Sequence, residues 1–145
     1  RMVIDHDDAD DVVQDVFVKV WRNLEKFRED SQLYTWLYRI ATNECITFLN
    51  KKKQKQNVSL DGEDSSYLAD TLTASSYFNG DAAQLKLQQA LLKLPEKQRL
   101  VFNMKYFEDL KYEEISDIVG TSVGALKAAY HLAVKKIELF FRSND

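Results

Sequence analysis

The chain has 145 residues, a formal net charge of −3, one cysteine and an apolar content of 45%, which is ordinary for a globular protein. It has no long apolar run that could insert into a membrane, and the lone Cys45 excludes an internal disulfide and fits a reducing cytoplasm. Four glycines, one proline and a repeated 3.6-residue periodicity predict an all-α fold. Residues 1–15 and 57–81 are acidic and residues 36–56 are basic, which predicts separate partners.

A first helix is predicted over Asp8 to Leu24, because apolar residues recur there at helical spacing. The stripe expected to be buried consists of Val13, Val16, Phe17, Val20, Leu24 and Phe27. Aspartates at the start of this helix favour the positive end of its dipole. They do not form an EF-hand loop, because Asp10 stands where that loop needs glycine. The polar outer face is either solvated or a docking surface for a basic protein.

After the loop KFREDS, a second helix is predicted over Leu33 to Lys53, with a lysine-rich end. Its aromatic residues, an amide and the basic end suit single-stranded DNA, because rings stack on bases, an amide reads a base edge and lysines hold phosphates. The residues concerned are Tyr34, Trp36, Tyr38, Arg39 and Asn43. Each of them also fits an ordinary helix, with Trp36 partly in the core and the lysines solvated.

Residues 54–80 lack a sustained helical period and are rich in Ser, Asp, Thr and Gly, so they are predicted to be a flexible linker. Its apolar residues predict that part of it docks, namely Tyr67, Leu68, Leu72, Tyr77 and Phe78. A helix resumes at Asp81, and Pro95 fits the first turn of the next helix, Glu96 to Glu108. That helix is expected to turn Val101, Met104 and either Tyr106 or Phe107 inward.

The stretch from Leu110 to Phe141 predicts two helices joined by a tight turn. The first runs from Tyr112 to Val119, Gly120 suits a left-handed C-cap, and Thr121 or Ser122 caps the second helix. The second helix has an apolar stripe, Val123, Leu126, Tyr130, Ala133, Ile137 and Phe140, and a small and basic opposite face. This is the helix-turn-helix pattern, whose second helix enters the major groove of DNA. An ordinary helical hairpin is the alternative.

Two separated motifs resemble conserved regions of sigma-70-type sigma factors. The resemblance to region 2 lies in two stretches, DVVQDVFVKVWRNLEKF and TWLYRIATNECITFL. The resemblance to region 4 lies in LPEKQRLVFNMKYFEDLKYEEISDIVGTSVGALKAAYHLAVKKI. The absence of a third domain between them is similar to the extracytoplasmic-function (ECF) group. The resemblance implies two small helical domains, 1–53 as region 2 and 81–145 as region 4, joined by the linker 54–80. It implies a bacterial, cytoplasmic protein that is not an enzyme, binds core RNA polymerase and directs promoter recognition and −10 strand opening.

The resemblance also implies roles for individual residues. The clamp helices of the largest polymerase subunit are expected to bind Asp11, Gln14, Asp15, Phe17 and Trp21. The −10 element is expected to contact Phe27, Arg28, Ser31, Tyr34, Trp36, Tyr38, Arg39 and Asn43. The −35 element is expected to contact Ser122, Gly124, Ala125, Lys127, Ala128 and His131, with Arg99 and Lys135 on phosphates.

The chain departs from the family pattern in three places. Ala129, Leu132 and Val134 stand where the family's recognition helix commonly has arginines, which predicts readout of DNA by close approach and shape. Lys111 replaces the usual hydroxyl cap of the first helix of the motif. The first helices of region 2 are absent before Arg1, which predicts that about 20–40 residues of that domain are missing.

Family analogy implies an anti-sigma factor as a further partner, and no cofactor or metal is expected. The acidic linker is hypothesised to fold onto the basic 36–56 face and compete with DNA. Two other classes stay open: a helix-turn-helix regulator that binds duplex DNA without polymerase, and an acidic protein-interaction module. An enzyme lacks a site here, because His6 and His131 are isolated and no metal-ligand spacing or glycine-rich phosphate loop occurs.

Overall fold

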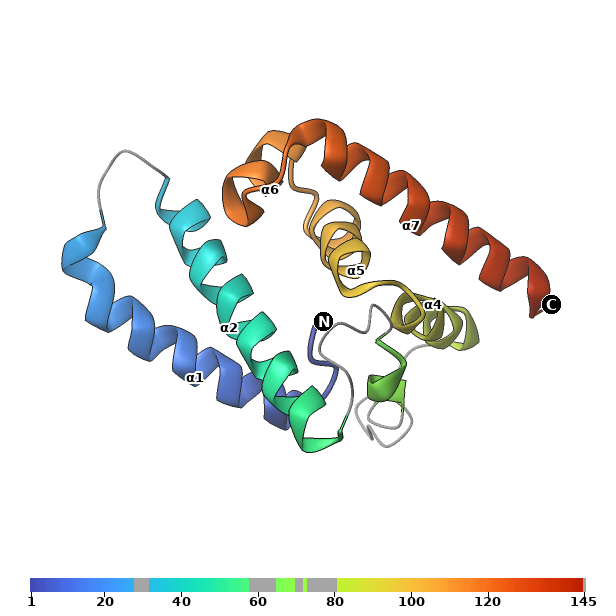
Figure 1. The fold of residues 1–145 in the computed structure, drawn as a ribbon, viewed down its shortest axis with the longest axis horizontal. Coiled ribbons are helices and arrows are strands. Elements are labelled where there is room, and N and C mark those ends of the chain that lie inside the picture. The colour runs from blue at the N-terminus through green and yellow to red at the C-terminus, as the bar shows by residue number, and fades with distance from the viewer. Residues whose placement is uncertain (28–31, 58–64, 70–71, 73–80, 145) are drawn as a thin grey trace.

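The computed structural model describes residues 1–27, 32–57, 65–69, 72 and 81–144 (Figure 1). Every regular element in these ranges is helical, which confirms the predicted all-α fold. The α-helices are α1 (His6–Asn23), α2 (Leu33–Lys55), α4 (Ala82–Leu92), α5 (Glu96–Phe102), α6 (Tyr112–Val119) and α7 (Val123–Ser143). Shorter turns are η1 (Leu24–Lys26), η2 (Ser66–Leu68) and the π-helical η3 (Asn103–Phe107). None of these helices combines the length and the apolar character needed to cross a membrane.

Helices α1 and α2 form an antiparallel pair (Figure 1). The Asp5 carboxylate caps α1 by accepting the backbone N–H of Asp8 at 3.0 Å. Acidic residues in the first turn lie at the positive end of the helix dipole, so part of the acidic cluster has a structural role. Two ion pairs join the helices: Lys19 with Glu44, and Lys52 with Asp8 at 2.9 Å.

The buried stripe predicted for α1 is wrong for Val13, Phe17 and Leu24, which are 49%, 69% and 50% exposed. The buried residue of α1 is Val12, and Val16 is partly buried beside it. Apolar residues occupy a wider arc of α1 than one neighbouring helix covers, since such a stripe is about 100° wide. The helix therefore turns Val12 toward α2 and leaves a second apolar side in solvent.

The helix after Pro95 is shorter than predicted, because the chain continues from α5 into the π-helical turn η3. Val101 and Met104 are buried as predicted. Of the two aromatic alternatives, Phe107 is partly buried and packs in a cluster with α4 and α7, whereas Tyr106 is exposed. Both rings lie near Phe102: the Tyr106 ring stacks on it with centroids 5.0 Å apart, and the Phe107 ring meets it edge-on with centroids 6.1 Å apart.

Helices α6 and α7 form the predicted helix-turn-helix. Helix α6 has the predicted boundaries, and α7 continues to Ser143, beyond the predicted end of the stretch at Phe141. Gly120 at the C-cap of α6 has φ 72° and ψ 21°, in the left-handed region. The Ser122 hydroxyl caps α7 by accepting the backbone N–H of Ala125 at 3.3 Å. The Lys111 ammonium cannot accept a hydrogen bond, but the Lys111 backbone N–H donates to the Glu114 carboxylate at 3.0 Å. This hydrogen bond is one of the two that make up a capping box, and it stabilises the start of α6.

Replacing Gly120 by alanine is expected to lower the free energy of unfolding by about 1 kcal/mol, because a Cβ is strained in the left-handed region. An added Cβ there would meet no atom within 4 Å, so the backbone alone is responsible. Gly124→Ala is the control, because Gly124 also has free space but lies in α7, where alanine stabilises a helix by about 1 kcal/mol. Urea unfolding measures the free energy of unfolding of both variants. Equal changes of the same sign in the two variants would contradict the prediction.

Three apolar clusters hold the helices together. The basal cluster includes Met2, Val12 and Leu49 of the N-terminal half, Leu92 of α4, and Leu68 and Leu72 between them. Part of the linker therefore docks, as predicted for Leu68 and Leu72. Tyr77, Phe78 and all the acidic residues of the linker lie outside the described residues. The helix-turn-helix cluster is centred on Val101, Met104, Leu110, Ile115, Ile118 and Leu126, and a third cluster joins Leu91, Leu94, Phe102 and Ala133.

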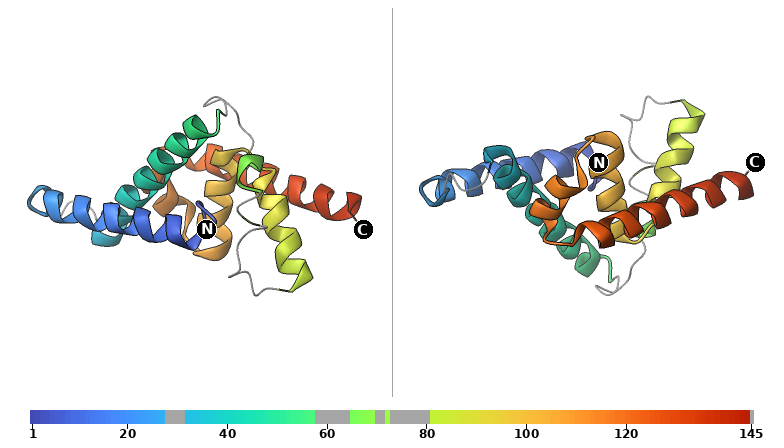
Figure 2. Two further views of the ribbon diagram at one scale, coloured as in Figure 1. Left: turned by 90° about the horizontal axis from the view of Figure 1, so that it is seen from below. Right: turned by 90° about the horizontal axis from the view of Figure 1, so that it is seen from above.

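The two halves of the chain lie against each other in this structure. Helix α2 runs beside α6, and the N-terminal segment passes between α2 and α5 (Figures 1 and 2). Tyr34 and Tyr38 of α2 pack against the helix-turn-helix cluster. Sequence alone predicts two separate helical units, and the structure adds a direct contact between them.

Candidate protein and nucleic-acid interfaces

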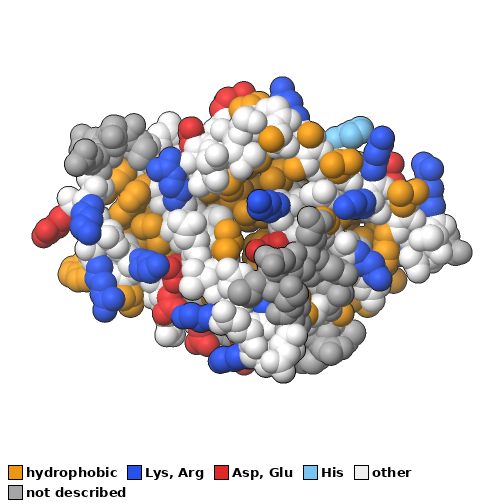
Figure 3. All heavy atoms as spheres, in the orientation of Figure 1, with side chains coloured by type: hydrophobic (Ala, Val, Ile, Leu, Met, Phe, Trp, Pro, Cys, Tyr) orange, Lys and Arg blue, Asp and Glu red, His pale blue; other side chains and the backbone are white. Residues whose placement is uncertain are grey.

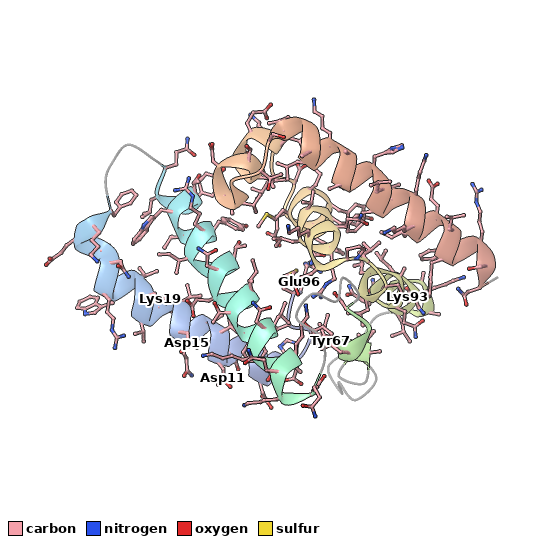
Figure 4. The ribbon with its side chains drawn as sticks, in the orientation of Figure 1. Asp11, Asp15, Lys19, Tyr67, Lys93 and Glu96 are labelled. Atoms are coloured by element: carbon pink, nitrogen blue, oxygen red, sulfur yellow. The ribbon has the colours of Figure 1, made fainter. Side chains whose placement is uncertain are left out.

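The outer face of α1 is formed by Asp11, Gln14, Asp15, Phe17 and Trp21, the residues expected to bind polymerase. All five are exposed, Trp21 by 81% and Phe17 by 69%. Figure 4 labels Asp11 and Asp15 along this helix. A large exposed aromatic pair beside charged residues is typical of a protein-interaction site, because isolated proteins rarely leave such area in water.

The aromatic pair Phe27 and Trp36 marks the two ends of the loop between α1 and α2. Their ring centroids are 5.1 Å apart, and both side chains are partly buried. Residues 28–31 between them lie outside the described residues, including the predicted DNA contacts Arg28 and Ser31. The partial burial of Trp36 fits both alternatives from the sequence, a core position and a stacking platform.

Helix α6 covers the next part of α2, which we call the α2–α6 seam. The Arg39 guanidinium donates through Nε to the Asp117 carbonyl oxygen at 2.7 Å. The Tyr38 hydroxyl donates to Glu108 Oε2 at 3.3 Å. Burial, and then the charge of Glu108 and this hydrogen bond, raise the pKa of Tyr38. Tyr34 packs edge-on against Tyr38 with centroids 5.9 Å apart, so the three predicted DNA contacts form one set of contacts to the other half of the chain.

Beyond the seam, α2, α5 and the helix-turn-helix line an open cavity of about 360 Å³. Asn43, the remaining predicted −10 contact, lies on its wall with Ile46, and the opposite wall includes Leu100, Val119 and Ala129. Asn43 is exposed. The cavity is therefore an apolar groove with an amide at its edge, open between the two halves.

The outer face of α7 carries the residues expected to contact the −35 element. All seven of those on this helix or its cap are exposed: Ser122, Gly124, Ala125, Lys127, Ala128, His131 and Lys135. Figure 3 shows lysine and arginine side chains gathered along this edge of the molecule. Small residues at the N-terminal turns permit close approach, and the basic residues further along attract phosphate. The core stripe, with Leu126 and Ala133, lies on the opposite side.

Arg99 differs from the expected phosphate contact, because its side chain is only 1% exposed. Its Nη1 donates to the Met2 carbonyl oxygen at 2.9 Å. Burial lowers the pKa of Arg99, and the nearby Tyr67 and Glu96 act in the opposite direction. In this arrangement Arg99 joins the N-terminal segment to α5 and cannot reach a phosphate.

A second buried cation, Lys53, lies close to Arg99 at the end of α2. Its ammonium pairs with the Glu96 carboxylate at 3.1 Å and lies 5.5 Å from the centre of the Tyr67 ring. Figure 4 labels Tyr67 and Glu96 where η2 and α5 meet. Burial, reinforced by Glu96, raises the pKa of Tyr67 to about 12. Residues from α2, the linker and α5 thus form one polar junction at the base of the molecule.

Catalytic chemistry has little basis in the part of the chain that the structure describes. No group of three or more His, Cys, Asp or Glu side chains there could hold a metal ion. Burial raises the pKa of the partly buried Cys45 thiol, which makes a thiolate nucleophile less accessible.

Sequence reasoning missed two features of these surfaces. It placed Val13 and Leu24 in the core, although they extend the exposed aromatic face of α1. The excess of apolar residues around that helix was the available signal. It also missed the buried charges of Lys53 and Arg99, for which the sequence offers no signal, because both partners lie far away in the chain.

Comparisons with known proteins agree with this arrangement. Residues 1–55 match the family described as Sigma-70 region 2, and residues 84–137 match Sigma-70, region 4. The ECF RNA polymerase sigma factor SigW of Bacillus subtilis is 33% identical over 138 residues, covering 90% of this chain and 74% of SigW. The RNA polymerase sigma-H factor of Pseudomonas aeruginosa is 31% identical over 145 residues, covering 95% of this chain and 75% of the sigma-H factor.

Two solved structures share the fold. The sigma factor RpoE in complex with the anti-sigma factor NepR from Bartonella quintana has a TM-score of 0.72 at 22% identity, covering 98% of this chain and 86% of RpoE. CnrH in complex with the cytosolic domain of CnrY has a TM-score of 0.66 at 24% identity, covering 99% of this chain and 77% of CnrH. The likeness extends over both halves of the chain.

Proposed function

Because the chain belongs to the ECF group of sigma-70 family sigma factors, which direct RNA polymerase in promoter recognition and transcription initiation, we propose how its parts divide that work. Residues 1–53 bind core polymerase and the −10 element, residues 81–145 bind the −35 element, and residues 54–80 connect them. Family membership excludes the two alternatives, a polymerase-independent regulator and an acidic interaction module. Sigma factors are not enzymes, so no catalytic residues are assigned.

The observation that supports this division is the exposure of two helix faces, the outer face of α1 and the outer face of α7. Neither face is needed for an apolar core. On α1, Phe17 and Trp21 offer apolar area, and Asp11, Gln14 and Asp15 offer polar and charged groups. This combination suits the clamp helices of the largest polymerase subunit, a partner that must be recognised specifically. Aromatic side chains at the centre of an interface typically supply most of the binding energy.

The −10 element is held by α2 and the loop before it. Phe27 and Trp36 flank the loop, where a base taken out of the duplex can stack. Asn43 offers an amide to a base edge, while Tyr34, Tyr38 and Arg39 support strand opening. Arg28 and Ser31 complete the proposed set, and they lie outside the described residues.

The −35 element is held by the outer face of α7 in the major groove. Ser122, Gly124, Ala125 and Ala128 permit close approach, and Lys127, His131 and Lys135 contact bases or phosphates. Arg99 joins this set only if the N-terminal segment releases it, because the Met2 carbonyl holds it here.

The experiment that tests the proposal is reconstitution of core RNA polymerase with the full-length protein, followed by sequencing of transcript 5′ ends. The expected result is a set of new start sites that share sequences at −10 and −35 and are absent with core polymerase alone. A preparation that binds core polymerase but starts no new transcripts would contradict the proposal.

Ala128→Leu is expected to reduce binding of the reconstituted holoenzyme to such a promoter by tenfold or more, because the added bulk blocks close approach of α7 to the groove. Stability should change little, since Ala128 is exposed and leucine is a good helix former. Glu138→Leu adds the same side chain at an exposed position of α7 outside the proposed set and should leave binding within twofold. Electrophoretic mobility shift measures the promoter affinity of both variants. Equal losses of affinity would contradict the assignment of the −35 contact to this face of α7.

An anti-sigma factor is the second proposed partner. This proposal is supported by the two similar solved structures. RpoE is in complex with the anti-sigma factor NepR, and CnrH is in complex with the cytosolic domain of CnrY. The apolar groove between α2 and the helix-turn-helix, with Asn43 at its edge, fits an amphipathic helix of such an inhibitor. Co-purification of the protein from its own cells, followed by mass spectrometry, is the direct test.

A further inference from the structure

A second cavity, of about 230 Å³, is lined by residues of α2, α5, η3 and the N-terminal segment. The chain contains one cysteine and two methionines, and all three of these side chains line this cavity: Cys45 of α2, Met104 of η3 and Met2. These residues lie far apart in the sequence, so only the folded chain brings its three sulfur atoms to one cavity. Arg1 and Glu108 also line it with half-exposed side chains, so the cavity opens to solvent.

The three sulfur-containing side chains lie in a mainly apolar wall. Met2 and Met104 are buried, and Cys45 is partly buried. Methionine often fills gaps in apolar cores, so either methionine alone would be an ordinary packing residue. Its three rotatable bonds also let its thioether turn toward a ligand. Because the three side chains surround an open space, they form a set of donor atoms and not only a filled core.

Asn103 adds a polar group to the same wall, and its side chain is only 6% exposed. Its Nδ2 donates to the Met2 sulfur at 3.3 Å, which fixes the position of that thioether. Its Oδ1 is buried and accepts no hydrogen bond from the described residues. Burying a polar atom without a partner is costly, so this oxygen indicates that the cavity has a place for a ligand.

We propose that this cavity is a binding site for one Cu(I) ion, held by the thiolate of Cys45 and the thioethers of Met2 and Met104. Thiolate and thioether sulfur atoms are soft ligands that select Cu(I), whereas Zn²⁺ sites are built from cysteine, histidine and carboxylate ligands. One thiolate and two neutral thioethers balance the charge of a monovalent ion, so the loaded site is neutral and can lie in an apolar wall. Zn²⁺ would leave a net positive charge there.

Binding exchanges a proton for the metal ion at Cys45, and no atom changes its oxidation state. Burial raises the pKa of the Cys45 thiol, so the thiol keeps its proton in the free protein. A coordinated thiol loses this proton, which passes to water as the copper–sulfur bond forms. The Asn103 oxygen is the weak fourth ligand, a role that an amide oxygen takes in some copper sites. None of the four donor residues is assigned to polymerase or DNA, so the site does not depend on the proposed function.

The affinity of the full-length protein for Cu(I) is measured by competition with the chromogenic chelator bicinchoninate, without oxygen and with a reductant. Wild type should bind one Cu(I) per chain, and Cys45→Ala should bind none. Met2→Leu and Met104→Leu keep the side-chain volume but remove a sulfur. Each should weaken binding by at least about tenfold, because even residues that only position a ligand contribute that much to metal sites.

Ala41→Ser is the matched control, because it alters the wall of the same cavity without removing a sulfur. It should leave the affinity for Cu(I) within twofold of wild type. If the double variant Met2→Leu, Met104→Leu binds Cu(I) as tightly as wild type, the thiol alone binds the ion and the proposed site is wrong. Absence of Cu(I) binding by wild type would overturn the proposal as well.

X-ray absorption at the copper edge provides a second test that does not depend on affinity. The loaded wild-type protein should show three sulfur atoms around the copper, and Met104→Leu should show one fewer. Nitrogen or oxygen atoms in place of the thioethers would contradict the assigned ligands. Transcription by reconstituted polymerase decides the proposed function separately, because this measurement needs neither polymerase nor DNA.

Discussion

Trp21→Ala is expected to weaken binding of the protein to core RNA polymerase by about 30-fold, which corresponds to the 2 kcal/mol typical of an interface hot spot. The indole is 81% exposed in the free protein, so its removal costs the fold little packing. Phe17→Ala, on the same face, should weaken binding by about tenfold. Titration of a fluorescently labelled protein with core polymerase measures both affinities, and urea unfolding checks that stability is retained.

Leu139→Ala is the matched control for the α1 face. Leu139 is a large exposed apolar residue on α7 that belongs to no proposed interface, and its loss should change polymerase affinity less than twofold. If Trp21→Ala binds polymerase like wild type, the outer face of α1 is not the docking site. If it loses binding and stability together, the indole has a structural role that its exposure does not explain.

Glu96→Gln is expected to destabilise the packing of the two halves against each other by about 3 kcal/mol, because it leaves the Lys53 ammonium without an opposite charge. The Lys53 side chain is 4% exposed, and its ammonium lies 5.5 Å from the centre of the Tyr67 ring. The least costly relief is separation of the two halves, which returns the ammonium to water. Small-angle X-ray scattering should therefore show a larger radius of gyration, and the thermal unfolding midpoint should fall.

The double variant Lys53→Met, Glu96→Gln removes the unpaired charge and serves as the rescue. Methionine fills a similar volume, and replacing a whole buried ion pair by apolar groups is often neutral or stabilising. The double variant should regain most of the compactness that Glu96→Gln loses. If Glu96→Gln alone leaves both the scattering curve and the unfolding midpoint unchanged, the junction does not hold the two halves together.

Helices and their ends follow from local chemistry, and local chemistry is written in the sequence. Gly120 and Ser122 define the turn between α6 and α7, because a left-handed C-cap and a hydroxyl N-cap are properties of single residues. The apolar stripe of α7 is predicted correctly because it has one buried side only. The two conserved motifs likewise depend on residue order alone, so the amino-acid sequence is sufficient to recognise the family.

The orientation of α1 and the contact between the two halves are decided only by tertiary structure. Helix α1 has two apolar sides, and which one is buried depends on the position of α2, whose Leu49 packs in one cluster with Val12. Arg99 resembles a phosphate contact in the sequence, yet a carbonyl 97 positions away, that of Met2, binds it in the interior. Periodicity reports which residues avoid water, but it contains no information about which distant surface covers them, because that choice is made by the free energy of packing the whole chain.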